Sequence, residues 1–413
     1  MKFRRLLLLV LIVVAVTGGM AAYLLLRPIT HDPQQFKQAV RLLADSLQRQ
    51  LLVHRGIGLS EATIALGGGS HEAASIVVAP FVDANFGEAV KASQDLQRLL
   101  TDALDSRGAF HTTPLTPDSL VGAQYVMFGV IVLEDYFTDQ GEIEKRYHLV
   151  ASVVDHETRR VAAQGSVWVA ESDLDYTPAP LYRDSPMFPR DQRLASLVTI
   201  ARSKPGKEAD REYYDSLETN ALMAEAESEF DAGNYKHARA LFQQASERKD
   251  GQVMKAYLGL YRSEVKLNDL VSAEGAFASL VSVSADNGLN TKFLFGVNST
   301  EFIADPSLRI QYNMWTRQIG RYFSSNLRCL DVVGHSSRTG AAAYNDALSR
   351  SRAERIRQRI TDGFADVANR SRADGKGYHE NLVGSGTDDQ RDALDRRVEV
   401  LSVDCPDPEV FRR

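Results

Sequence analysis

The sequence is poor in the features that mark catalytic and nucleic-acid-binding proteins. Only two of its 413 residues are cysteine, and Lys plus Arg (48) are outnumbered by Asp plus Glu (54), which leaves a formal net charge of −6 and no basic footprint for nucleic acid. No G-x-S-x-G elbow or Cys-His constellation is present, and His71-Glu72 is followed by Ala73-Ala74-Ser75, so the H-E-x-x-H pattern fails. We therefore predict a protein that is not an enzyme, holds no cofactor or metal, and has no nucleic-acid partner.

One long uncharged run stands out at the amino end. Residues 6–26 carry no charge and follow three basic residues. At 1.5 Å per residue a helix over this run would be about 31 Å long, enough for a bilayer core of about 30 Å. The run predicts a cytoplasmic tip and transmembrane anchor over residues 1–27, with the bulk of the chain in the periplasm beside the inner membrane. The alternative is a signal peptide cleaved near the small residues 18–22, which would leave a periplasmic or outer-membrane-associated protein.

Residues 33–175 alternate between strand and helix patterns. The expected elements are a helix over 35–52, a strand over 75–81, a helix around 96–104, a strand over 125–132, and a hairpin formed by 147–155 and 160–170. This order predicts a small α/β sandwich. Asp155-His156-Glu157 lies in the hairpin turn, where a solvated turn is a better interpretation than a metal site because no second cluster offers matching ligands.

Two short motifs in this module carry a resemblance. Val78-Ala79-Pro80-Phe81 and Tyr125-Val126-Met127-Phe128-Gly129 resemble an envelope module shared by the curli secretion-lipoprotein, flagellar FlgO-type and penicillin-binding-protein-activator families. The resemblance implies contact with other proteins rather than catalysis.

The middle of the chain changes composition twice. Residues 176–212 combine prolines with charged residues and are interpreted as a linker. Residues 213–285 turn helical, and Ala238 and Phe242 recur as Ala273 and Phe277 thirty-five residues later, close to the 34-residue period of tetratricopeptide repeats. A plain pair of helical hairpins remains the alternative.

Residues 288–405 hold the most informative segment. An apolar strand over 330–333 is followed by the turn residues Gly334-His335-Ser336-Ser337-Arg338-Thr339-Gly340 and by a helix over 344–360. Arg352 lies beside the apolar stripe of this helix, where a guanidinium needs an anion to offset its desolvation. The anion could be a ligand carboxylate or an internal partner such as Asp331 or Asp346.

The same segment resembles a known family. Asn345-x-x-Leu348-Ser349-x-x-Arg352-Ala353, preceded by Gly334-His335 and followed by Asp395-Arg396-Arg397-Val398-Glu399, is similar to the OmpA-like peptidoglycan-binding domain. The resemblance implies a βαβαββ fold in which a loop Asp and the Arg of the Leu-Ser-x-x-Arg-Ala motif clamp diaminopimelate in the wall stem peptide. The corresponding site residues are Ser337, Asn345, Arg352 and Arg397.

This chain departs from the family at two positions. Ser337 stands where the family usually has the ammonium-binding Asp, and a hydroxyl carries no charge, so the ligand amine should be held less tightly unless Asp346 or another acid reaches it. Asp395 stands where Asn usually precedes the paired arginines.

Both cysteines fall in this last region. Export to an oxidising compartment predicts a Cys329–Cys405 disulfide rather than a free pair, worth roughly 4 kcal/mol in the chain-entropy model.

We expect a multidomain protein of the α+β class. The chain is predicted to be a membrane-anchored periplasmic scaffold that binds diaminopimelate-type peptidoglycan and presents protein-binding modules to partners. The alternative is a regulator or activator of a cell-wall synthase, or an envelope assembly factor.

Overall fold

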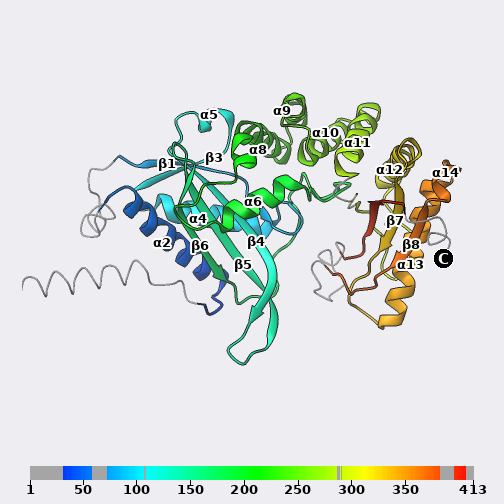
Figure 1. Cartoon of the computed structure of the whole chain (residues 1–413), viewed down its shortest axis with the longest axis horizontal. Helices are drawn as coiled ribbons and strands as arrows, with labels where there is room; N and C mark the ends of the chain where they lie inside the picture. The colour runs from blue at the N-terminus through cyan, green and yellow to red at the C-terminus, as the bar shows by residue number, and fades with distance from the viewer. Residues whose placement is uncertain are drawn as a thin grey trace, which may run out of the picture.

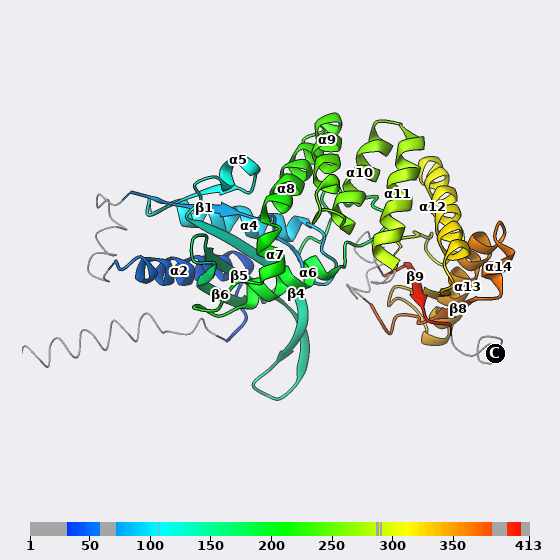
Figure 2. The same ribbon diagram turned by 45° about the horizontal axis from the view of Figure 1, so that its top comes forward.

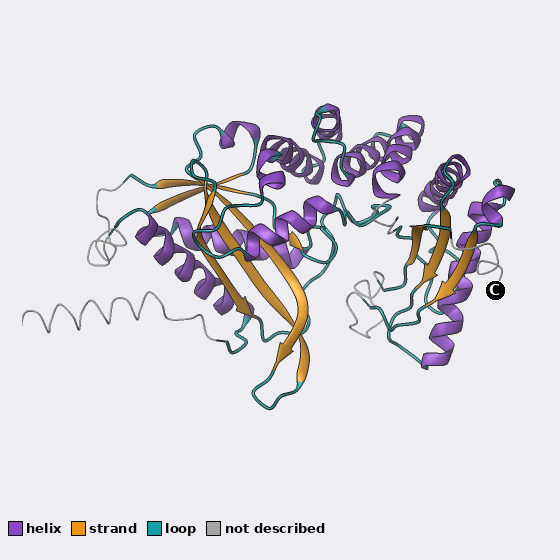
Figure 3. Cartoon of the chain, viewed as in Figure 1, coloured by secondary structure: helices purple, strands orange, loops and turns teal. Residues whose placement is uncertain are grey.

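The computed structural model describes residues 31–57, 72–106, 108–285, 289, 291–381 and 395–405. Over these residues the chain is a mixed α/β protein with twelve helices and two sheets (Figure 3). None of the described helices is long and apolar enough to cross a membrane, and residues 6–26 lie outside the described part. The predicted transmembrane helix is therefore not supported, and the fold class is corrected to mixed α/β with two sheets.

The larger sheet has the strand order β3-β1-β4-β5-β6, with the short β2 paired to β4. The strands are β1 Ala74–Val78, β2 Val82–Asp83, β3 Phe110–Pro114, β4 Tyr125–Phe137, β5 Ile143–Asp155 and β6 Arg160–Trp168. β1 runs parallel to β3 and β4, whereas β4, β5 and β6 are antiparallel. The predicted β-α-β order and hairpin are both present. Gly129 of β4 must be glycine, because a Cβ there would collide with the ring of Phe81.

Helices cover both faces of this sheet (Figure 1). α2 (Phe36–His54) and α4 (Lys91–Asp105) pack on one face, and α6 (Gln192–Arg202) and α7 (Arg211–Asp215) pack on the other, while α5 (Pro117–Leu120) is a short turn of helix. α6 comes from the segment predicted as a linker. That segment is packed rather than exposed, since Tyr182, Phe188 and Ile200 are all buried. Composition alone was misleading here, because prolines and charges surround apolar residues that the sheet and the helical stack bury.

Four helices then form two antiparallel hairpins. They are α8 Leu217–Asp231, α9 Tyr235–Glu247, α10 Met254–Lys266 and α11 Leu270–Ser284. The recurring Ala238, Phe242, Ala273 and Phe277 are all fully buried, and Gly259 lets α10 approach the ring of Phe242. The helical prediction is confirmed, while the assignment to tetratricopeptide repeats stays a prediction. α12 (Pro306–Ser325) packs on α11 and extends the stack (Figure 2).

The carboxyl-terminal sheet has the order β8-β7-β9. Its elements are β7 Cys329–Gly334, α13 Ala342–Thr361, α14 Ala365–Ala368, β8 Ser371–Gly375 and β9 Val398–Val403. β8 is parallel and β9 antiparallel to β7. The first strand of the expected βαβαββ order is reduced, among the described residues, to isolated bridges from Leu289 and Lys292 to β9. The predicted Cys329–Cys405 disulfide is present and joins the start of β7 to the end of β9.

A buried cluster around Lys292 joins the carboxyl-terminal part of the chain to the α/β module. Lys292, 5% exposed, pairs with Glu88 of the α/β module, donates to the Ser185 hydroxyl (3.1 Å), and lies 4.2 Å from the centroid of the Phe188 ring. Its backbone NH also donates to Pro186 O (2.7 Å). The carboxyl-terminal part therefore packs directly against the α/β module through these contacts.

Candidate functional site

The candidate site is the loop of residues 335–339, which follows the carboxyl end of β7. Gly334 and Gly375 end two adjacent parallel strands, and a Cβ on either would collide with the backbone of α13. Glycine at both positions lets the helix lie close against the strand ends. In open α/β sheets this edge is where ligands bind.

The structure brings the four predicted site residues together around this loop. The NH of His335 donates to Arg397 O (2.9 Å), and Arg352 Nη1 reaches His335 O (3.5 Å). Asn345 Nδ2 donates to the carbonyl oxygen of a loop residue (3.0 Å). Ser337 lies in the loop itself and is 6% exposed. All four residues are buried, so they shape the loop from beneath.

Arg352 is satisfied by its own chain in this conformation. Its Nε donates to Ser299 O (2.9 Å) and its Nη2 to Gly296 O (3.0 Å), while the guanidinium carbon lies 5.3 Å from the Phe295 ring centroid. The side chain is 1% exposed. Carbonyl dipoles therefore offset the buried charge. The segment that supplies them, residues 295–299, covers Arg352 and was not anticipated from the sequence.

The internal carboxylate partners considered for Arg352 are engaged elsewhere. Asp331 receives a two-pronged bond from Arg372 (2.5 Å to each oxygen). Asp346 lies 3.6 Å from His379 Nε2. Asp331 and Asp346 therefore form ion pairs with Arg372 and His379.

Arg397 has a buried carboxylate partner. Its Nε donates to Glu399 Oε1 (2.7 Å), and His335 Nε2 lies 3.7 Å from Glu399 Oε2. Burial alone would raise the pKa of Glu399, but His335 and Arg397 lower it to about 2. The sequence motif contains Glu399 but gave it no role. In the structure Glu399 helps to hold Arg397 in place.

Several buried polar atoms at the loop lack a partner. Among the described residues, both ring nitrogens of His335, the Ser336 hydroxyl and Arg397 Nη1 make no hydrogen bond. Buried polar groups are paired in the large majority of cases. These atoms therefore mark a place where a polar ligand or water would restore hydrogen bonds.

A half-exposed acid lies beside the loop. Asp346 is 48% exposed, and its carboxylate sits so close to Gly377 that a Cβ there would overlap it. Gly377 O in turn accepts from the NH of Ser336 (2.8 Å). Gly377 thus lies between the Asp346 carboxylate and the loop, in which Ser337 stands where the OmpA-like pattern has Asp.

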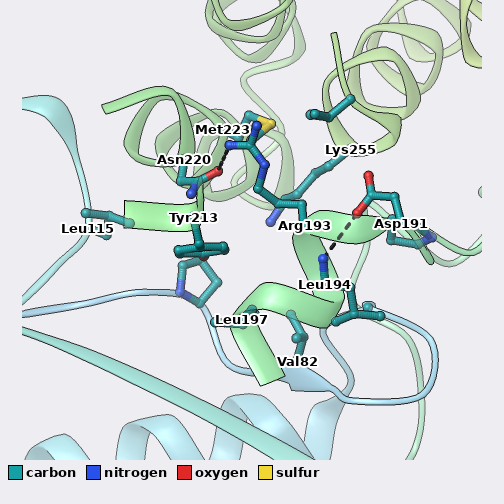
Figure 4. A pocket seen from close by; sticks show the side chains of 14 residues that line it. Val82, Leu115, Asp191, Arg193, Leu194, Leu197, Tyr213, Asn220, Met223 and Lys255 are labelled. Atoms are coloured by element: carbon teal, nitrogen blue, oxygen red, sulfur yellow. Dashed lines mark hydrogen bonds between the residues drawn. The ribbon is translucent and has the colours of Figure 1, made fainter. Parts of the chain in front are cut away.

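A second hollow, between the α/β module and the helical hairpins, is too small to be a ligand site. Figure 4 shows Arg193 pointing to Asn220, which accepts its bond (3.0 Å), and Asp191 accepting from the NH of Leu194 (3.2 Å) at the start of α6. The hollow measures about 60 Å³, whereas small-molecule sites usually measure about 300–1,000 Å³. It is a polar joint between two parts of the fold.

Comparisons with known proteins add little. No family model matches the chain, and no curated protein matches it. Among solved structures, the chain is similar to the peptidoglycan-associated lipoprotein from Burkholderia pseudomallei, with 24% identity over 27% of this chain and 87% of that one, at a TM-score of 0.23. With a TM-score this low, no conclusion about this chain depends on the similarity.

Proposed function

We propose that this chain is a non-enzymatic cell-envelope protein that binds peptidoglycan at the 335–339 loop and presents its α/β module and helical hairpins to partner proteins. The observation that carries the proposal is the convergence of Ser337, Asn345, Arg352 and Arg397 on one loop at a strand end. The unpartnered polar atoms of His335, Ser336 and Arg397 support a ligand site at that loop.

Within this proposal the ligand's two charged ends meet different residues. Asp346 supplies the carboxylate for the diaminopimelate ammonium that the Ser337 hydroxyl cannot match in charge. Within the described part of the chain, Arg397 Nη1 and His335 Nδ1 are buried at the loop without a hydrogen bond and are the groups that meet the ligand carboxylate, while His335 Nε2 faces Glu399 (3.7 Å). Arg352 acts from beneath as a positioning residue, because its donors already hold the Gly296, Ser299 and His335 carbonyls.

Sedimentation of the full chain with purified sacculi tests the proposal. Wild type should co-sediment, and Asp346→Asn should bind about tenfold more weakly, since it loses a charge-assisted bond of about 1.4 kcal/mol. The matched control is Asp366→Asn in α14, a half-exposed acid that pairs with Arg370 (3.1 Å) beyond the carboxyl end of α13. It should bind like wild type.

The two parts of the proposal fail separately. Wild type that stays in the supernatant would contradict peptidoglycan binding altogether. Wild-type binding that Asp346→Asn leaves unchanged would contradict only the role of Asp346.

A second candidate, activation of a cell-wall synthase through the α/β module, is favoured by the arm formed by β4 and β5. The two strands pair through Phe137 and Ile143, beyond the residues that β6 covers, and the arm projects from the body (Figure 1). Phe137 and Ile143 are 63% and 61% exposed. An exposed apolar pair at the tip of an arm is typical of a protein-binding surface. If the candidate is correct, the chain should raise the polymerisation rate of a purified synthase, and Phe137→Ser should abolish that increase.

A further inference from the structure

A row of arginines follows the seam between α12 and α13. Arg317 and Arg321 are neighbours four residues apart on α12, and Arg309 lies eight residues before Arg317 on the same helix. Arg355 and Arg359 are likewise four residues apart on α13, and the two helices pack side by side (Figure 2). We call these five residues the arginine seam.

The seam borders a surface pocket of about 700 Å³. Arg317, Arg321 and Arg359 line it, together with Phe364. Phe364 packs so closely on α12 that a Cβ at Gly320 would collide with its ring. The pocket therefore combines the closely packed Phe364 ring with three guanidinium groups, the Asp362 carboxylate and the polar Asn313 and Thr316.

The carboxylates near the seam do not balance its charge. Glu274 is shared by Arg317 (2.7 Å) and Arg321 (3.8 Å), and Glu301 pairs with Arg355 (2.6 Å). Asp362 is the other acid that lines the pocket. The three arginines that line the pocket thus have two carboxylates near them, Glu274 and Asp362.

Arg309 and Arg359 are the members of the seam with no ion pair among the described residues, although the Arg359 guanidinium lies 4.9 Å from the centroid of the Phe302 ring. Within the described ranges neither has a carboxylate oxygen within 4.0 Å, and Arg359 Nη1 donates only to the neutral Asn313 Oδ1 (3.1 Å). Burial, followed by the neighbouring Arg355, lowers the pKa of Arg359, as expected where positive charges crowd together.

Two ordinary explanations account for only part of this pattern. A cation near a helix carboxyl end is favoured by the helix dipole, which explains Arg359 in the last turn of α13 but not Arg309 or Arg317 in the first half and middle of α12. The chain as a whole carries a formal charge of −6, so a general excess of basic residues does not account for the arginines here.

We propose that the arginine seam is a binding site for phosphate groups. The planar guanidinium fork binds phosphate in a two-pronged manner, and several forks around one pocket suit an anion with more than one charge. The phosphate belongs either to a soluble phosphate compound or to a phospholipid head group. The site is separate from the proposed peptidoglycan loop, which lies at the opposite end of α13.

The experiment uses the full chain and two probes at low ionic strength. Pyrophosphate is titrated by calorimetry, and flotation compares vesicles of phosphatidylcholine with and without phosphatidylglycerol. The test variant is Arg359→Gln, and the matched control is Arg350→Gln, an arginine of α13 that is 67% exposed and pairs with Asp374 (3.0 Å) away from the seam.

Wild type and Arg350→Gln should bind alike, whereas Arg359→Gln should bind about tenfold more weakly. A loss seen with pyrophosphate assigns the site to soluble phosphate compounds, and a loss seen only with phosphatidylglycerol vesicles assigns it to lipid head groups. Absence of binding to both probes, or equal weakening by Arg350→Gln, would overturn the proposal. Sacculus binding by wild type is scored separately, so this result does not depend on the peptidoglycan proposal.

Discussion

Replacing Arg352 with alanine separates a positioning role from direct ligand contact. In the folded chain this side chain donates to three backbone carbonyls, at Gly296, Ser299 and His335. Alanine would leave these carbonyls without their donor in a place where water has little access, since the side chain is 1% exposed. A buried polar group that loses its partner is costly.

The magnitude follows from the geometry. Two of the bonds are short, at 2.9 and 3.0 Å, and the third is at 3.5 Å, so we count two full bonds. A hydrogen bond with a charged partner contributes about 1.5–3 kcal/mol, so two such bonds predict a loss of about 3–6 kcal/mol in the free energy of unfolding. Arg352→Lys keeps the charge but reaches fewer carbonyls, so it should lose about half as much.

Urea unfolding followed by tryptophan fluorescence measures this loss. The chain has two tryptophans, and a Trp168→Phe background leaves Trp315, which is buried in α12 and reports on this part of the molecule. Arg350→Ala is the control, because an exposed ion pair contributes at most about 1 kcal/mol. A loss below about 1 kcal/mol in Arg352→Ala would refute the positioning role. Unchanged stability with lost sacculus binding would instead establish direct contact with the ligand.

Three further predictions concern stability. Reduction of the Cys329–Cys405 disulfide should lower the free energy of unfolding by about 4 kcal/mol, measured by urea unfolding with and without reductant; an unchanged midpoint would argue against it. Lys292→Met should cost about 3–5 kcal/mol by leaving the Glu88 carboxylate buried without its partner, and adding Glu88→Gln should recover part of that loss; additive losses would contradict the pairing. Because the pKa of Glu399 falls from 4.5 to about 2 on folding, its contribution of about 3 kcal/mol is complete above about pH 4.5 and is lost as the pH falls towards 2. The difference in stability between wild type and Glu399→Gln should shrink over that range, and a constant difference would exclude the linkage.

The local elements of this protein follow from the sequence alone. The apolar run at residues 125–132 predicts the buried strand β4, and the apolar stripe ending at Ile360 predicts α13, because periodicity is a property of neighbouring residues. The disulfide pairing also follows, since the two cysteines of the sequence allow a single pairing within the chain. The resemblance to the OmpA-like pattern predicted Ser337, Asn345, Arg352 and Arg397 as one site, and the structure brings these residues to one loop.

Other features were decided by contacts between distant residues. The prolines of residues 176–212 suggested a linker, but α6 from that segment covers the larger sheet. Arg352 donates to carbonyl groups that precede it by 53 and 56 residues in the sequence. Lys292 pairs with Glu88, which precedes it by 204 residues. The sequence pattern can show that a charged residue lies near the apolar face of its helix. Such a residue needs a partner, because burying an unpaired charge is costly. Which group becomes that partner depends on how segments far apart in the chain pack together, and only the tertiary structure determines that.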